Sequence, residues 1–273
     1  MVLFLGLCFG VYKYKDVLDG WLNGLLGDSG VREEQVGVYS FVTLEQLEDI
    51  LESGEQAQEL ICSGEILVID KDMTLTGVNL SSQYLTVADG VTLTVQDGNV
   101  MSHHLLVDGD IILSYGSISA AEELTVHGSV SVGESASVQF EPNVKIEGKD
   151  RIYFGDNAGG FCYFCWSSSD LTTVLKKIPE DLDGDPAMVY LVEERDYDLT
   201  DDIPEGVGLM TLSSDVALHI PEGSTVQLNG SLDLSGGNTL TVEGDLVVGG
   251  EMYLFWNQKE VHPLLRISES GTV

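Results

Sequence analysis

Positive charge is scarce in this sequence of 273 residues, which has 12 lysines and arginines against 45 aspartates and glutamates. The formal net charge is −33. Nucleic-acid binding needs a cationic face opposite the phosphates, and docking on an anionic membrane surface needs one as well. We therefore expect no nucleic-acid partner and no attachment to an anionic membrane surface.

Cysteine is also rare, with four residues at positions 8, 62, 162 and 165. That is too few for a disulfide scaffold in a chain of this length. Cys162 and Cys165 form a CxxC within FCYFCW, but a structural zinc site needs a second pair, which the sequence lacks. We interpret both as small hydrophobic residues in a buried aromatic strand. A local disulfide is the alternative.

Long hydrophobic runs are missing except for residues 2–11, VLFLGLCFGV. A membrane span needs about 20 apolar residues, so we expect no stable span within this chain. The first cations, Lys13 and Lys15, follow the run, whereas a secretory signal carries them before it. Three interpretations stay open: the remnant of a signal or anchor, an element of a neighbouring domain, or an apolar terminal helix.

Familiar catalytic and phosphate-binding motifs are absent as well. The segment GDNAGG at 155–160 lacks the lysine of a phosphate-binding loop, and neither GxSxG nor HExxH occurs. We therefore expect a protein that is not an enzyme and has no cofactor, with calcium as the one ion to consider.

A short repeat fills the middle of the chain. The strings LTVADG, LLVDG, LTVHG and VKIEG end at Gly90, Gly109, Gly128 and Gly148, which are spaced by 19, 19 and 20 residues. After the first three strings comes a second alternating string: VTLTV, IIL or VSV. A fixed period near 20 residues with short strands is typical of a solenoid.

The alternation of apolar and polar residues sends one set of side chains inward and the other to solvent. A leucine-rich repeat would need LxxLxLxxN strings, which are absent. The pattern therefore predicts an all-β solenoid, a parallel β-helix with coils of about 19–20 residues stacked about 4.8 Å apart.

The sequence also contains a longer repeat, each copy of which includes several of these coils. Residues 85–98 (LTVADGVTLTVQDG) match 210–223 (MTLSSDVALHIPEG), and 124–130 (LTVHGSV) match 240–246 (LTVEGDL). The sequence thus predicts a tandem duplication, in which residues 1–40 form an apolar stub and linker, 41–160 the first β-helix repeat and 161–273 the second.

Each repeat is expected to begin with a short helix. The first, over 43–54, has Thr43 as its N-cap; the second covers 170–178. Their apolar positions are Leu44, Leu47 and Leu51 in the first helix and Leu171, Val174 and Ile178 in the second. A helix covers the bare core that a solenoid leaves at its end, so we expect the first one to act as a cap.

A cluster of carboxylates at Asp181, Asp183 and Asp185 resembles the start of a calcium loop. An EF-hand would need glycine at position 6 and glutamate at position 12, but these places hold Pro186 and Val192. The remaining hypotheses are a looser calcium site on the three aspartates and a plain polar turn at the end of the helix.

Other candidate groups rest on weaker patterns. Residues preceding the turn glycines form an expected column, in which a histidine between carboxylates would bind a metal or titrate near neutral pH; a row of solvated turn residues is the alternative. Two adjacent histidines are expected to point in different directions. The groups are the column Asp89, Asp108, His127 and Glu147; the acidic cluster Asp196, Asp198, Asp201 and Asp202; the pair His103 and His104; and the sugar-stacking candidates Trp166, Phe255 and Trp256.

The strings LTVADG, LTVHGSVSV and LTVEGDLVV resemble the right-handed parallel β-helix repeats of secreted and surface-anchored bacterial proteins. The resemblance covers about 70–154 and 205–255 and implies an extracellular or cell-surface location. Members of that group include polysaccharide lyases and hydrolases, adhesins and stalk-like modules, so the fold does not select an activity. The short coils also resemble bactofilins, which polymerise end to end.

From these observations we expect a non-enzymatic extracellular β-solenoid module of a bacterial surface protein. Its role would be to act as a spacer, to display, or to bind a carbohydrate or a host protein. Two alternatives are a β-helix polysaccharide lyase or hydrolase and a bactofilin-like subunit that assembles into filaments.

Overall fold

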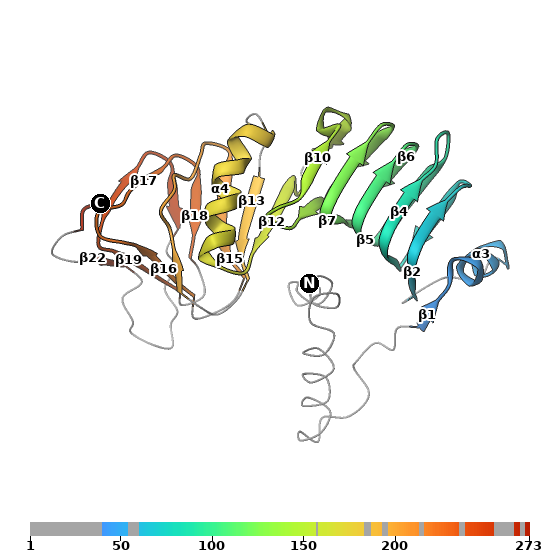
Figure 1. Cartoon of the computed structure of the whole chain (residues 1–273), viewed down its shortest axis with the longest axis horizontal. Coiled ribbons are helices and arrows are strands. Elements are labelled where there is room, and N and C mark those ends of the chain that lie inside the picture. The colour runs from blue at the N-terminus through green and yellow to red at the C-terminus, as the bar shows by residue number, and fades with distance from the viewer. Residues whose placement is uncertain are drawn as a thin grey trace, which may run out of the picture.

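The computed structural model describes residues 40–53, 60–156, 158–182, 187–192, 196–212, 216–234, 238–253, 265–267 and 271–273. These residues form a β-solenoid of about nine turns, built mostly from parallel strands with two helices (Figure 1). The prediction of an all-β parallel β-helix is therefore confirmed.

One parallel sheet, sheet A, runs along the whole stack. The strands that follow one another along it are β1 (Ser40–Val42), β2 (Leu60–Ile69), β4 (Val78–Val87), β5 (Thr92–Val107), β7 (Gly116–Val126), β9 (Ala136–Phe140), β12 (Phe161–Cys165), β13 (Ala187–Leu191), β15 (Val207–Thr211), β18 (Ser231–Asp233) and β21 (Glu251–Tyr253). At about 4.8 Å per strand, sheet A is about 50 Å long.

Smaller sheets complete the coils on either side of the middle. Sheet B belongs to the first half and combines β3 (Met73–Thr76), the start of β5, β6 (Asp110–Leu113), β8 (Ser129–Val132) and β11 (Ile152–Phe154). The second half has sheet C, made of β14 (Asp196–Asp198), β16 (Ala217–Ile220), β19 (Thr239–Val242) and β22 (Leu265–Ile267), and sheet D, made of β17 (Thr225–Leu228) and β20 (Asp245–Val248). The strand β10 (Lys145–Glu147) pairs with β7, and the 3-10 turn η1 (Lys149–Arg151) follows it.

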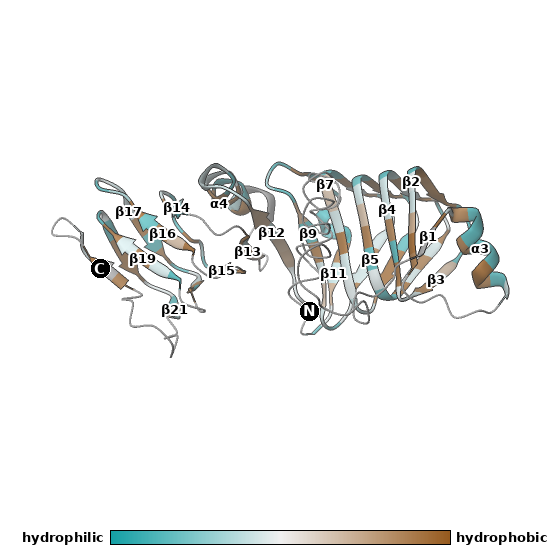
Figure 2. Cartoon of the chain, turned by 90° about the horizontal axis from the view of Figure 1, so that it is seen from below, coloured by the Kyte–Doolittle hydropathy of each residue, from teal (hydrophilic) through white to brown (hydrophobic). Residues whose placement is uncertain are grey.

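The interior of the solenoid is filled with aliphatic side chains because each strand alternates. In β6, Ile111 and Leu113 are fully buried while Asp110 and Ile112 face solvent. Figure 2 shows the resulting succession of hydrophobic and hydrophilic positions along the strands. The apolar residues of successive coils lie in register, so the core is continuous from one coil to the next.

The helix α3 (Leu44–Ser53) follows β1 and packs against β2 with Leu47 fully buried. It begins at the expected residue, since the Thr43 hydroxyl accepts a hydrogen bond from the Gln46 amide at 3.3 Å. In return, the Gln46 side chain accepts one from the Thr43 amide at 2.9 Å. This reciprocal capping box fixes the start of the helix that covers the core at this end.

Replacing Thr43 with alanine should loosen α3 by about 1 kcal/mol, because one helix-end amide loses its partner. We expect hydrogen exchange at the Leu47 amide, which donates to the Thr43 carbonyl at 2.9 Å, to accelerate about fivefold. The matched control is Thr43→Ser, which keeps the hydroxyl and should retain the protection. Equal exchange rates in the two variants would contradict a capping role for this side chain.

The second helix, α4 (Ser168–Leu182), replaces the rest of a coil in the middle of the solenoid. It starts two residues before the predicted range and ends four residues after it. On one side the Lys177 ammonium donates to the Val144 carbonyl of the first half. On the other, the Asp198 amide of the second half donates to the Ser168 hydroxyl at 2.9 Å. The helix thus lies between the last coil of sheet B and the first of sheet C.

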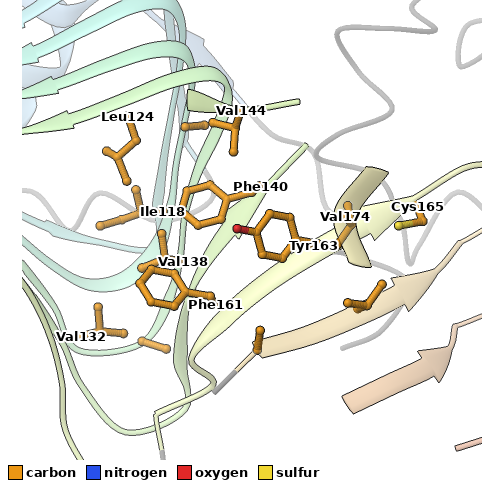
Figure 3. Packing of buried hydrophobic residues seen from close by; sticks show 14 of the residues in the cluster. Ile118, Leu124, Val132, Val138, Phe140, Val144, Phe161, Tyr163, Cys165 and Val174 are labelled. Carbon is orange, nitrogen blue, oxygen red and sulfur yellow. The ribbon is translucent and has the colours of Figure 1, made fainter. Parts of the chain in front are cut away.

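Large aromatic residues fill the core beside this helix (Figure 3). Phe161 stacks on Phe140 with ring centroids 5.7 Å apart and meets the edge of Phe154 at 4.8 Å. Tyr163 packs beside Phe140 at 5.3 Å, close to Val174 of α4. These rings occupy the core at the level where α4 packs against the solenoid.

Sheet A continues across the boundary expected at residue 160, since β12 pairs with both β9 and β13. The units β1–α3 and β12–α4 have the same strand-then-helix order at the start of each half. The matched strings 124–130 and 240–246 occupy comparable turns, from β7 to β8 and from β19 to β20. The match of 85–98 with 210–223 is offset by one strand, because the register row of Leu85 continues to Ile146 of β10, whereas β15 continues the row of β9.

The coils also vary in length more than the repeat predicts. The pairing of Leu80 with Val100 gives a coil of 20 residues, and that of Val100 with Ile118 gives 18. The coil that contains α4 is the longest of these examples, since Phe161 pairs with Ala187. Of the two described helices, neither is both long and apolar enough to span a membrane.

Candidate functional site

The calcium hypothesis cannot be placed on the structure, because the Asp181 side chain, Asp183 and Asp185 lie outside the described residues. Within the described ranges, no group of three histidine, cysteine, aspartate or glutamate side chains has a geometry that holds a metal ion. The ionisable groups form pairs and small columns between coils instead.

The expected column of turn residues is only partly formed. His127 Nδ1 lies 2.7 Å from Asp108 Oδ1 on the preceding coil. Asp89 sits in a turn two residues longer, and Glu147 pairs in register with Thr125 rather than with His127. The prediction of a four-residue column is therefore wrong, because the turns on neighbouring coils differ in length.

A histidine between two carboxylates does occur, but at His219, which the sequence argument missed. Its Nδ1 lies 3.1 Å from Asp198 Oδ1 and its Nε2 lies 3.0 Å from Glu243 Oε2. These residues come from three successive coils. Burial lowers the pKa of His219, but hydrogen bonds and charges from Glu243 and Asp198 outweigh it, so the pKa is raised overall.

The pair His103 and His104 converges on one carboxylate. His103 Nδ1 lies 3.2 Å from Glu122 Oε1, and His104 Nε2 lies 3.4 Å from Glu122 Oε2. The expectation that the two rings point in different directions is wrong, because the pairing between β5 and β7 shifts between Ser102 and His104. The irregularity interrupts the alternation of the strand and leaves both rings half-buried on the same side.

A row of outward-facing side chains crosses sheet A at this place, and we call it the outer ladder. The Tyr84 and His104 rings stack at 4.7 Å with an interplanar angle of 7°. Ile66 is 66% exposed and Tyr84 46% exposed. In register order the outer ladder contains Ile66, Tyr84, His104, Glu123 and Lys145.

The stacking direction limits what the outer ladder can bind. The rings lie one above another along the stack of coils, so the face of Tyr84 is covered by His104. This pairing leaves less ring face for a sugar to stack on. Trp166, the sugar-stacking candidate that the structure describes, is half-buried with its Nε1 atom enclosed. Phe255 and Trp256 lie outside the described residues.

The acidic cluster at 196–202 is divided between different contacts. Asp196 and Asp198 face outward on β14. The Asp201 carboxylate lies 3.5 Å from the Lys176 ammonium of α4, and Asp202 Oδ1 accepts a hydrogen bond from the Gln227 amide at 2.7 Å. These carboxylates hold neighbouring coils and the helix together, as ordinary structural charges do.

The cysteines of the CxxC segment are free thiols on opposite faces of β12. Cys162 occupies the register position beside Gln139, whereas Cys165 belongs to the apolar core. Residues three apart in a strand point to opposite sides, so they are too far apart for a disulfide. The interpretation as small hydrophobic residues is confirmed.

Native thiols in this protein should resist alkylation, because burial raises the pKa of Cys62 to about 11, that of Cys162 to about 12, and that of Cys165 as well. Only the thiolate reacts with iodoacetamide. In a Cys8→Ser variant at pH 8 we expect no labelling in the folded state and three labelled residues in urea, measured by mass spectrometry. Rapid labelling of folded Cys162 would contradict the burial of this thiol.

Comparison of the chain with protein-family models, curated proteins and solved structures found no match.

Proposed function

We propose that this chain is a non-enzymatic, extracellular β-solenoid module of a bacterial surface protein that acts as a rigid spacer and displays a binding surface. The observation that carries the proposal is the continuity of sheet A from β1 to β21. A single sheet with an in-register aliphatic core resists bending at every coil and keeps its two ends about 50 Å apart.

The outer ladder is the best candidate for the displayed surface. It presents exposed apolar side chains, including Ile66 and Tyr84, beside the polar cluster formed by His103, His104 and Glu122. Apolar groups next to charges suit a protein or carbohydrate partner better than a lipid surface, because the net charge of −33 repels anionic lipids. The partner is a carbohydrate or a host protein.

No observation on the described residues specifically supports either of the two alternative functions. A lyase or hydrolase would use paired carboxylates in the 181–202 region, yet three of the described carboxylates there contact His219, Lys176 and the Gln227 amide. A filament that grows end to end would need the first coil open for stacking, but α3 covers the core beside β2.

The first test is a glycan array and polysaccharide pull-down with the full chain, with and without calcium, followed by analysis of the polysaccharides for cleavage. We expect no cleavage, and any retention should be lost in Tyr84→Ser. The matched control is Tyr153→Ser, an exposed tyrosine on sheet B. Cleavage of any polysaccharide would overturn the proposal, and so would sedimentation that increases with concentration toward filaments.

A further inference from the structure

His219 joins three successive coils through both nitrogens of its ring. Asp198 lies on β14, His219 on β16, and Glu243 directly after β19. A neutral imidazole has only one N–H and can donate to one carboxylate, whereas the imidazolium has two and donates to both. With carboxylates at 3.1 and 3.0 Å from its two nitrogens, the site is matched to the protonated ring.

Residues of both charges lie on the elements packed around the ring. β14 presents Asp196 and Asp198, and Thr241 is the residue of β19 in register with His219. The turn after β16 carries Glu222, and Arg266 holds the next register position on β22. The His219 side chain is 30% exposed, which lets protons exchange with solvent while water screens the charges only in part.

The strand that this ring holds is the first of sheet C, where the second half meets α4. The amide of Leu199, directly after β14, donates to the His219 carbonyl at 2.8 Å. On the other side of β14, the Asp198 amide donates to Ser168 of α4. β14 is also held by the fully buried Tyr197, whose hydroxyl donates to the Cys165 carbonyl at 3.1 Å, so the contact between Asp198 and His219 adds to a strand that is packed into the core.

We propose that His219 is a pH-sensitive clasp: its protonation ties β14 to the two following coils, and its deprotonation loosens the junction between α4 and sheet C. This inference rests on the column of Asp198, His219 and Glu243 and is independent of the proposed spacer function. The clasp makes the middle of the rod tightest under mildly acidic conditions.

The direction of the pH dependence follows from the difference between the pKa of His219 in the folded chain and its pKa in the unfolded chain. The pKa of His219 is raised in the folded state above the ordinary value of 6.5. The stabilisation is therefore fully present below pH 6.5 and is lost as the pH rises through the folded-state pKa. Because the ion pairs are partly exposed, we expect an effect of about threefold on local opening.

The test is hydrogen exchange at the Leu199 amide of the full chain between pH 5.5 and 8.5, corrected for the intrinsic exchange rate. We expect protection to fall about threefold across this range in the wild type and to stay level in His219→Gln. The matched control is His127→Gln, which removes a histidine with one carboxylate partner in the first half and should leave the Leu199 profile unchanged.

A second measurement distinguishes the loss of the histidine charge from a change of structure in the His219→Gln variant. The ring protons of His219, followed by NMR, should titrate at a lower pH in Glu243→Gln than in the wild type. An identical pH profile in wild type and His219→Gln would overturn the proposal, and so would an unshifted titration in Glu243→Gln.

Discussion

Replacing Gly116 with alanine is expected to lower the stability of the solenoid by about 3 kcal/mol or more, through steric overlap and backbone strain together. Gly116 has φ 106°, and a Cβ at this position would lie 1.8 Å from the Gly98 carbonyl oxygen of the preceding coil. Gly98 and Gly116 pair in register on sheet A, so the added carbon would push two hydrogen-bonded strands apart. The midpoint of urea unfolding measures the loss.

Substitutions at two other glycines distinguish the cost of steric overlap from the cost of backbone strain. At Gly128 a Cβ would also lie 1.8 Å from a carbonyl, that of Gly109, but φ lies outside the left-handed range. Gly90 has φ 73° with nothing within 4 Å of the Cβ position. We expect alanine to be most harmful at Gly116, less at Gly128 and least at Gly90, where the cost is about 1 kcal/mol. Equal midpoints for the Gly116 and Gly90 variants would show that the coils relax around the extra carbon.

Replacing Phe161 with alanine is expected to cost about 3–5 kcal/mol, the second large effect. The ring is 1% exposed and contacts Phe140 and Phe154 at the level where α4 replaces strands. Coils on either side cannot close the cavity, because both are fixed by the pairing of β12 with β9 and β13. Urea unfolding followed by circular dichroism measures the change.

The matched control for Phe161 is Tyr153→Ala, which removes a ring that is 57% exposed on a nearby strand. Such a surface change should alter the stability by no more than about 0.5 kcal/mol. Phe161→Leu should recover part of the loss, since it keeps an apolar side chain of intermediate size. A Phe161→Ala variant as stable as Tyr153→Ala would contradict the role of the aromatic cluster in the junction.

The histidine–carboxylate pairs show which contacts could be predicted from the number of residues that separate the partners in the sequence. His127 lies 19 residues after Asp108, and His104 lies 19 residues before Glu123, which is one coil in each case. A search for a histidine and a carboxylate one coil apart would have found both pairs. The contact of His219 with Glu243 spans 24 residues, so a fixed period would have missed it.

The periodicity of the sequence by itself determined the fold class, the inward apolar positions and the Thr43 cap. These features depend on local alternation, glycine turns and side chains three residues apart, which the chain order displays directly. Only the tertiary structure decided which coils contain Asp198, His219 and Glu243 side by side, and that α4 replaces part of a coil. The reason is physical: coil lengths vary from 18 residues upward, and a shift of one residue turns a side chain to the opposite face.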